Sequence, residues 1–101
     1  MKTEIKPSEE RVTAFLLGDI DHHNAKKIRE EIDDAVIRCK PRELILDFGG
    51  VHFMDSSGIG LVLGRYRLMR ELGGIVKIQN HSPQIASLLA MGGIENIIKI
   101  R

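Results

Sequence analysis

Two adjacent serines, Ser56 and Ser57, follow Asp55 at the junction between a predicted strand and a predicted helix. The first backbone N–H groups of a helix have no partner within it, and the helix dipole is positive there. A phosphate group added to either hydroxyl would be stabilised at such a position. Asp and Ser are also ordinary helix N-caps, but a cap does not require two serines, an aspartate and the glycines Gly58 and Gly60 together. We therefore expect a functional segment here.

A hydrolytic nucleophile is one alternative reading of these serines. A nucleophile elbow has Gly two residues before and two residues after its serine, and neither Ser56 nor Ser57 has both. A triad would also need a histidine, and none of the four histidines has a distinctive context. We expect no catalytic residue, so the chain is not predicted to be an enzyme.

A phosphate-binding loop for nucleotides is a second alternative. That motif needs Gly-Lys followed by Ser or Thr, and Gly58-Ile59-Gly60 lacks the lysine. The nearest basic residue along the chain is Arg65, two turns into the predicted helix, so we expect no Lys or Arg in this cradle. A small phosphate- or nucleotide-binding protein that uses the Ser56–Gly60 helix start remains the alternative function.

Metal binding is not indicated by the adjacent pair His22 and His23. Neighbouring residues on a helix point about 100° apart and rarely share an ion. We expect these two histidines on the first turn of a surface helix, and His52 and His81 in loops. No metal and no other cofactor is predicted.

The elements that position the serines alternate between strands and helices. A turn at residues 7–10 joins the first two strands into an antiparallel hairpin, and the helical crossovers imply a mainly parallel sheet. The predicted class is therefore α/β, in the order β-β-α-β-α-β-α-β. The strands are Thr3–Lys6, Arg11–Leu17, Glu43–Phe48, Ile75–Ile78 and Ile97–Ile100, and the helices run from His22 to Cys39, from Ser57 to Leu72 and from Pro83 to the Gly92-Gly93 pair.

Asp21 is the predicted N-cap of the first helix. The strands that end at Leu17 and Phe48 are expected to be neighbours, so the loops after them emerge at one edge of the sheet. Asp21 and Ser57 would then share one rim.

Composition limits the class of protein. The chain has 101 residues and a net charge of +1, which suits one small domain and gives no general attraction to nucleic acid or membranes. A single cysteine, Cys39, excludes an internal disulfide and fits a reducing compartment. With no signal peptide and no long apolar run, we expect a cytoplasmic protein that is monomeric when free.

The chain resembles the STAS domain family, and within it the bacterial anti-sigma-factor antagonists. The resemblance rests on Met54-Asp55-Ser56-Ser57-Gly58-Ile59-Gly60 with the following 63–66 segment, Leu-Gly-Arg-Tyr, and on the 18–23 segment, Gly-Asp-Ile-Asp-His-His. The two segments together are most similar to the sporulation branch, which antagonises the anti-sigma F factor, and less to the stress-response branch. The resemblance covers residues 1–101 as one STAS domain.

The resemblance implies a partner-switching function. Family members bind an anti-sigma factor that is also a serine kinase, and so release the sigma factor. The kinase phosphorylates the second serine of the Asp-Ser-Ser-Gly motif, here Ser57, and a separate serine phosphatase restores the active form. The implied partner-binding residues are Asp21, His22, Asp55, Ser56, Ser57, Gly58 and Gly60. Family members continue past the last strand into a final amphipathic helix, whereas the sequence here stops at Arg101, so either the chain is truncated or this member lacks the helix.

Overall fold

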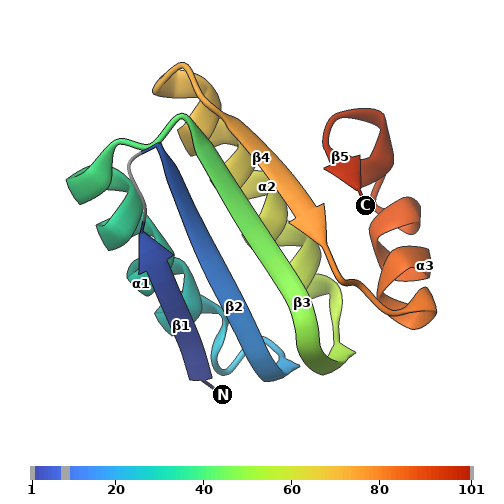
Figure 1. The fold of residues 1–101 in the computed structure, drawn as a ribbon. Coiled ribbons are helices and arrows are strands. Elements are labelled where there is room, and N and C mark those ends of the chain that lie inside the picture. Colours follow the sequence, from blue (N-terminus) through green and yellow to red (C-terminus); the bar gives the residue numbers. More distant parts are fainter. Residues whose placement is uncertain (1, 8–9, 101) are drawn as a thin grey trace.

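A computed structural model describes residues 2–7 and 10–100 of the chain. Figure 1 shows a sheet with the helices α1 and α2 against one of its faces and α3 at the side of the sheet where β4 and β5 lie. The predicted α/β order is confirmed, with one short 3₁₀ helix, η1, added before the last strand. The elements are β1 (Lys2–Pro7), β2 (Arg11–Ile20), α1 (Ala25–Cys39), β3 (Glu43–Met54), α2 (Ser56–Glu71), β4 (Ile75–Gln79), α3 (Pro83–Met91), η1 (Ile94–Asn96) and β5 (Lys99–Ile100).

The five strands of the sheet follow the chain order β1-β2-β3-β4-β5. β1 and β2 form the predicted antiparallel pair, and every later pair is parallel. The predicted turn between β1 and β2 includes Ser8 and Glu9, which lie outside the described residues. β2 and β3 are neighbours, as the topological argument required, so the loops after them leave the same edge of the sheet.

β2 and β3 are longer than predicted, because glycines expected to end them form irregularities within them. The β2–β3 register shifts between Phe15 and Leu17 and again between Gly18 and Asp19. Gly18 has a φ of 86°, which a glycine adopts without strain inside a bulge. At Gly50 a Cβ atom would overlap the Leu17 side chain, which would have to shift to admit any other residue there. Pairing then continues to Ile20 and Met54, and His52 lies in β3 instead of a loop.

The hydrophobic core lies between the sheet and the two helices α1 and α2. Every second residue of β2 is buried, from Val12 through Ala14 to Leu16, as the alternation predicted. In α1 the residues Ile28, Ile32 and Ala35 are buried, whereas Cys39 at the helix end is exposed. In α2 the buried face comprises Gly58, Leu61, Val62, Arg65 and Met69. Other apolar residues of α2, namely Ile59, Leu63 and Tyr66, are only partly buried.

A buried carboxylate joins β3 to the loop that follows β4. The side chain of Asp47 accepts hydrogen bonds from the Gly49 backbone N–H, from Gln79 Nε2 at 2.9 Å and from Asn80 Nδ2 at 2.8 Å. These donors satisfy a buried anion that would otherwise be costly. The Asp47 contacts therefore tie the middle of β3 to the end of β4 and to the loop that follows it.

The C-terminal part of the chain is more irregular than predicted. Ser82 caps α3 by accepting a hydrogen bond from the Ile85 N–H, and Ile85 and Leu89 point inward as expected. The strand expected from Ile97 shortens to Lys99–Ile100, because the N–H groups of Ile97 and Ile98 both donate to the Ile94 carbonyl and so continue the turn that follows η1. Ile94 is fully buried and anchors this turn to the core.

Candidate functional site

The ends of β2 and β3 bring the two loops of the predicted rim together. The Asp55 backbone N–H donates to the Ile20 carbonyl at 3.0 Å, directly after the last pair of the β2–β3 ladder. Ile20 and Met54 beneath that bond are buried, so the sheet edge there is fixed by packing as well as pairing. Asp21 therefore starts one loop and Asp55 the other, from adjacent points of one edge.

The α2 helix begins with a defined cap. Asp55 has an extended backbone, and its Oδ1 accepts a hydrogen bond from the Ser57 N–H at 2.8 Å. This bond is the main cause of a lowered pKa for the Asp55 carboxyl, and His22 contributes to the same shift. The carboxylate therefore stays ionised at neutral pH. Asp55 occupies the cap, so both serine hydroxyls are released from that role.

Ser56 and Ser57 are the first two residues of α2, one residue earlier than the predicted start. Ser56 is exposed and Ser57 is partly exposed. Among the described residues no hydrogen bond joins a histidine to either hydroxyl, so the arrangement supplies no general base for a hydrolytic nucleophile. What the geometry offers is a reachable hydroxyl at a capped helix start.

Asp21 caps a turn that precedes α1, which corrects its predicted place at the N-cap of the helix. Its Oδ1 accepts hydrogen bonds from the N–H groups of His23 at 2.9 Å and Asn24 at 3.2 Å. In return Asn24 Oδ1 accepts from the Asp21 N–H at 3.0 Å, which makes a reciprocal pair of the capping-box kind. The helix itself begins at Ala25 because residues 22–24 form the turn.

His22 and His23 were expected on the first turn of the helix, but they lie in the turn that precedes it. Both are exposed, and their ring centroids are 4.0 Å apart with the planes tilted by 37°. His22 Nδ1 lies 4.0 Å from Asp55 Oδ2, a long ion-pair distance that applies when the histidine is protonated. The contact places His22 beside the cap of α2, so this residue belongs to the predicted rim.

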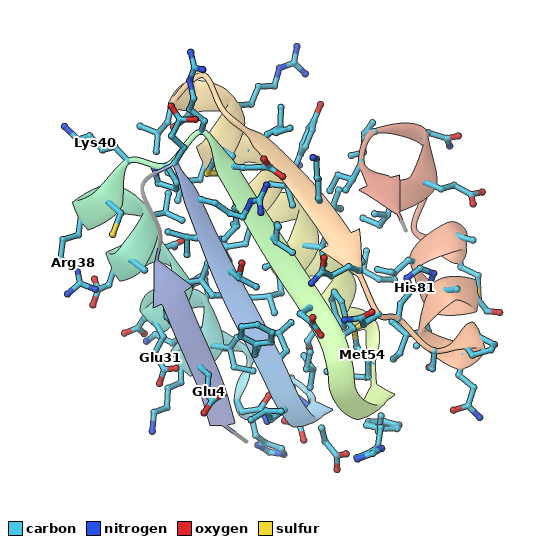
Figure 2. The ribbon with its side chains drawn as sticks, in the orientation of Figure 1. Glu4, Glu31, Arg38, Lys40, Met54 and His81 are labelled. Carbon is cyan, nitrogen blue, oxygen red and sulfur yellow. The ribbon has the colours of Figure 1, made fainter. Side chains whose placement is uncertain are left out.

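Gly58 and Gly60 have different structural roles. Gly58 is buried in α2, and a Cβ atom there would overlap the Met54 side chain. Figure 2 labels Met54 near the carboxyl end of β3, where its side chain fills the space beneath the start of α2. Gly60 is exposed, and a Cβ atom would meet no other atom within 4 Å. Gly58 therefore permits close packing, whereas packing does not explain Gly60.

A hollow of about 300 Å³ separates the first turns of α1 and α2, and we call it the α1–α2 hollow. It is lined by Ala25, Lys26, Arg29, Ser57, Gly60 and Leu61. The expectation that no Lys or Arg lies in the cradle is thus wrong, because α1 supplies two. The sequence signal was the spacing of Lys26 and Arg29, which places both on one face of a helix that starts at the rim.

Arg65, the nearest basic residue by sequence, is engaged elsewhere. Its Nε lies 2.8 Å from Asp33 Oδ1 of α1, and only 5% of Arg65 is exposed. Burial lowers the pKa of Arg65 and raises the pKa of Asp33, while each charge opposes the shift of the other. Arg65 therefore serves to hold the two helices together and is not available to a ligand at Ser57.

Two further classes of site find no support in the described part of the chain. Residues 2–7 and 10–100 contain no group of three or more His, Cys, Asp or Glu side chains that could hold a metal ion. Within the same residues no helix is long and apolar enough to cross a membrane.

The rim, the capped serines and the sheet order can be compared with known proteins. Residues 3–101 match the STAS domain family. The chain belongs to that family. This STAS domain is 36% identical over 85 residues to an anti-sigma F factor antagonist of Paenibacillus polymyxa, an alignment that covers 84% of this chain and 73% of the relative.

Two solved structures extend the similarity of this STAS domain to three dimensions. The anti-sigma factor antagonist SpoIIAA in its unphosphorylated form matches with a TM-score of 0.86 and 31% identity, covering 99% of this chain and 88% of that one. The Bacillus cell fate determinant SpoIIAA in the phosphorylated form matches with a TM-score of 0.77, also at 31% identity, covering 99% and 91%. The fold of this STAS domain is therefore that of a protein studied in two phosphorylation states.

Proposed function

We propose that this STAS domain is an anti-sigma-factor antagonist of the sporulation type. In its dephosphorylated form it binds an anti-sigma factor serine kinase and thereby releases the sigma factor. Phosphorylation on Ser57 ends that binding, and a serine phosphatase reverses it. The protein acts as substrate and switch, without catalysis of its own. Because the kinase uses ATP, a cytoplasmic location remains the prediction.

The observation that carries the proposal is the state of Ser57 at the start of α2. The Ser57 N–H supplies the cap bond to Asp55, so the cap does not depend on the Ser57 hydroxyl, although that hydroxyl also interacts with the Asp55 side chain. A phosphate near a helix N-terminus is compatible with the fold. The similarity to SpoIIAA, which exists in a phosphorylated form, supports the same conclusion.

The docking surface that we propose is the rim around Ser57. It comprises Asp21, His22, Asp55, Ser56, Ser57 and Gly60, whereas Gly58, predicted as a contact residue, is buried and supports the rim from within. A phosphate group within a docked interface must lose water, and several kcal/mol of binding, on the order of 2–5, are lost when a buried charge has no partner. The switch therefore acts on the partner's affinity and leaves the fold of this domain intact.

Incubation with the anti-sigma factor kinase of the same genome, ATP and magnesium tests the proposal. Peptide mass spectrometry is expected to place one phosphate on Ser57. The Ser57→Ala variant is expected to bind the kinase as the wild type does and to take up no phosphate, while Ser56→Ala remains a substrate. Phosphate on Ser56 would move the acceptor, and the absence of both binding and phosphate would exclude the function.

Anion or nucleotide binding is the second candidate function, and the α1–α2 hollow favours it more than the sequence did. Lys26 and Arg29 supply positive charge beside Ser57. Titration of ATP, with and without magnesium and without any partner protein, separates the two candidates. Micromolar, magnesium-dependent affinity would support the nucleotide-binding function, whereas an antagonist is expected to show none.

A further inference from the structure

The α1–α2 hollow collects positive charge next to the proposed phosphorylation site. Lys26 and Arg29 are three residues apart on α1, so they lie on one face of it, and both line the hollow together with Ser57. Neither forms an ion pair or a hydrogen bond within residues 2–7 and 10–100. Two long cationic side chains are therefore available to an anion that enters the hollow.

We propose that Lys26 and Arg29 bind the phosphate group carried by Ser57, so that phosphorylation ties α2 to α1 within one chain. This inference rests on the proposed phosphorylation of Ser57 and adds where the phosphate is held. The phosphate then links α1 to α2, a contact that we call the clasp, and it also presents a charge to the partner.

The charges around Ser57 direct a phosphate toward the hollow. Asp55, two residues earlier, is held ionised by the Ser57 N–H, so it repels a second anion at the cap. The Asp33 carboxylate interacts electrostatically with Arg29 and is also ion-paired with Arg65. Because Asp55 repels an anion and the two α1 cations attract one, the phosphate is expected to turn away from the cap, where the Ser57 hydroxyl interacts with Asp55, and to enter the hollow.

The chemistry and size of the hollow also fit a phosphate group. An arginine fork and a lysine ammonium together offer more donors than the three free oxygens of a phosphoserine require. Ala25 and Leu61 form the apolar part of the lining, and the hollow is open to solvent. The volume of about 300 Å³ is several times the ~30 Å³ that one water occupies in the liquid.

The test installs phosphoserine directly at position 57 of the full chain during translation, so no kinase is needed. The second pKa of the phosphate is then measured by ³¹P NMR. Nearby cations favour the dianion, so we expect this pKa to be lower than that of a protein with phosphoserine at position 56 by at least about half a unit. Ser56 is exposed and does not line the hollow, which makes it a matched reference.

Substitution of the two cations provides the decisive comparison. In the Lys26→Gln, Arg29→Gln double variant we expect the pKa of the phosphate at position 57 to rise to the reference value. The control variant, Lys27→Gln with Arg38→Gln, removes the same charge from α1 outside the hollow and is expected to leave the pKa low. An equal rise in both variants, or no difference between positions 57 and 56, would overturn the proposal.

Two further measurements complete the test. A general alkaline phosphatase is expected to remove the phosphate several-fold faster from the Lys26/Arg29 double variant than from the wild type, because the clasp no longer shields it. Inorganic phosphate added to the unphosphorylated protein at low millimolar concentration is expected to leave the NMR signals of both side chains unchanged. Saturable micromolar binding of free phosphate would instead assign the hollow to a soluble anion.

The outcomes separate this inference from the proposed function. If the kinase phosphorylates Ser57 but the cations do not affect the phosphate pKa, the switch stands and the clasp is excluded. If the kinase leaves Ser57 unmodified, the proposed function fails, while the installed phosphoserine still reports whether the hollow binds it.

Discussion

Arg65 Nε of α2 lies 2.8 Å from Asp33 Oδ1 of α1, an ion pair whose cationic member is almost fully buried. The contact fixes the distance between the two helices whose first turns enclose the α1–α2 hollow. The ion pair therefore contributes to the stability of the core and also helps to set the geometry around Ser57.

Removal of one member of this pair is expected to be strongly destabilising. Arg65→Ala leaves the partly buried Asp33 carboxylate without its partner, and we expect a loss of about 3 kcal/mol in the free energy of unfolding. Arg65→Met combined with Asp33→Asn keeps the volume, removes the charges and is expected to recover most of that loss. Urea denaturation measures both. Arg67→Ala, an exposed arginine of the same helix, is the control, and an equal loss there would exclude the ion pair as the cause.

Ser57→Asp is expected to weaken kinase binding with little effect on the fold. A carboxylate in the first turn of a helix is stabilising by roughly 0.3–1 kcal/mol, so the melting temperature should stay constant or rise slightly. Thermal melting and a pull-down with the kinase measure the two effects. Ser56→Asp carries the same charge one residue away and is expected to bind more tightly than Ser57→Asp. Unfolding of Ser57→Asp would show that the site is packed and would contradict the interface account.

Asp21→Asn separates capping from partner binding. Asn caps about as well as Asp, so the hydrogen bonds to the N–H groups of His23 and Asn24 can be kept and stability should be near normal. We expect weaker binding to the kinase, measured by isothermal titration. Asp34→Asn, an exposed change on α1, should leave binding unaffected. Normal binding by Asp21→Asn would show that Asp21 acts only as a cap and does not contact the kinase.

Gly58→Ala and Gly60→Ala should change stability in opposite directions. A methyl group at Gly58 displaces the buried Met54 side chain, and such overpacking costs about 1–3 kcal/mol. At the exposed Gly60 nothing is displaced, so the gain in helix propensity should stabilise by about 0.8–1 kcal/mol. Urea denaturation of both variants measures the difference. A stable Gly58→Ala protein would show that Met54 moves aside freely.

Asp55 should make the stability of the protein depend on pH in the acid range. Its pKa is lowered in the folded state, chiefly by the Ser57 N–H, so the unfolded chain binds the proton more readily. The stabilisation is present above the unfolded value of 3.8 and is lost as the pH falls through the folded pKa. We expect the stability difference between the wild type and Asp55→Asn to be constant at neutral pH and to shrink below that value. A difference that grows on acidification would have the wrong sign.

Local patterns in the sequence predicted most of the architecture. The alternation of Val12, Ala14 and Leu16 and the period of the helices established the elements, and the hairpin and crossovers then established the sheet order. The ends of β2 and β3 were placed too early, because a glycine reads as a break whether it ends a strand or forms a bulge. Only the pairing of Gly18 and Gly50 with their neighbours distinguishes the two cases.

The part of the candidate site that comes from one continuous segment could be predicted. The part that depends on the packing of α1 against α2 could not. Asp55 as cap and Ser57 as a reachable hydroxyl follow from the order of residues. The approach of Lys26 and Arg29 does not, because both read as solvent-facing charges of α1, and their distance from Ser57 depends on how α1 packs against α2. Arg65 was correctly placed outside the cradle, but its ion pair with Asp33 could not be predicted, because that pair also depends on how the two helices pack.

The bond from the Asp55 N–H to the Ile20 carbonyl uses backbone atoms alone, so any residue except proline at position 55 can form it. Side chains on the rim can therefore be exchanged without altering the spacing of the two loops. A duplicated copy of this chain could acquire a different partner through a few substitutions at positions such as 21, 22 and 56. The frame would stay constant while recognition diverges.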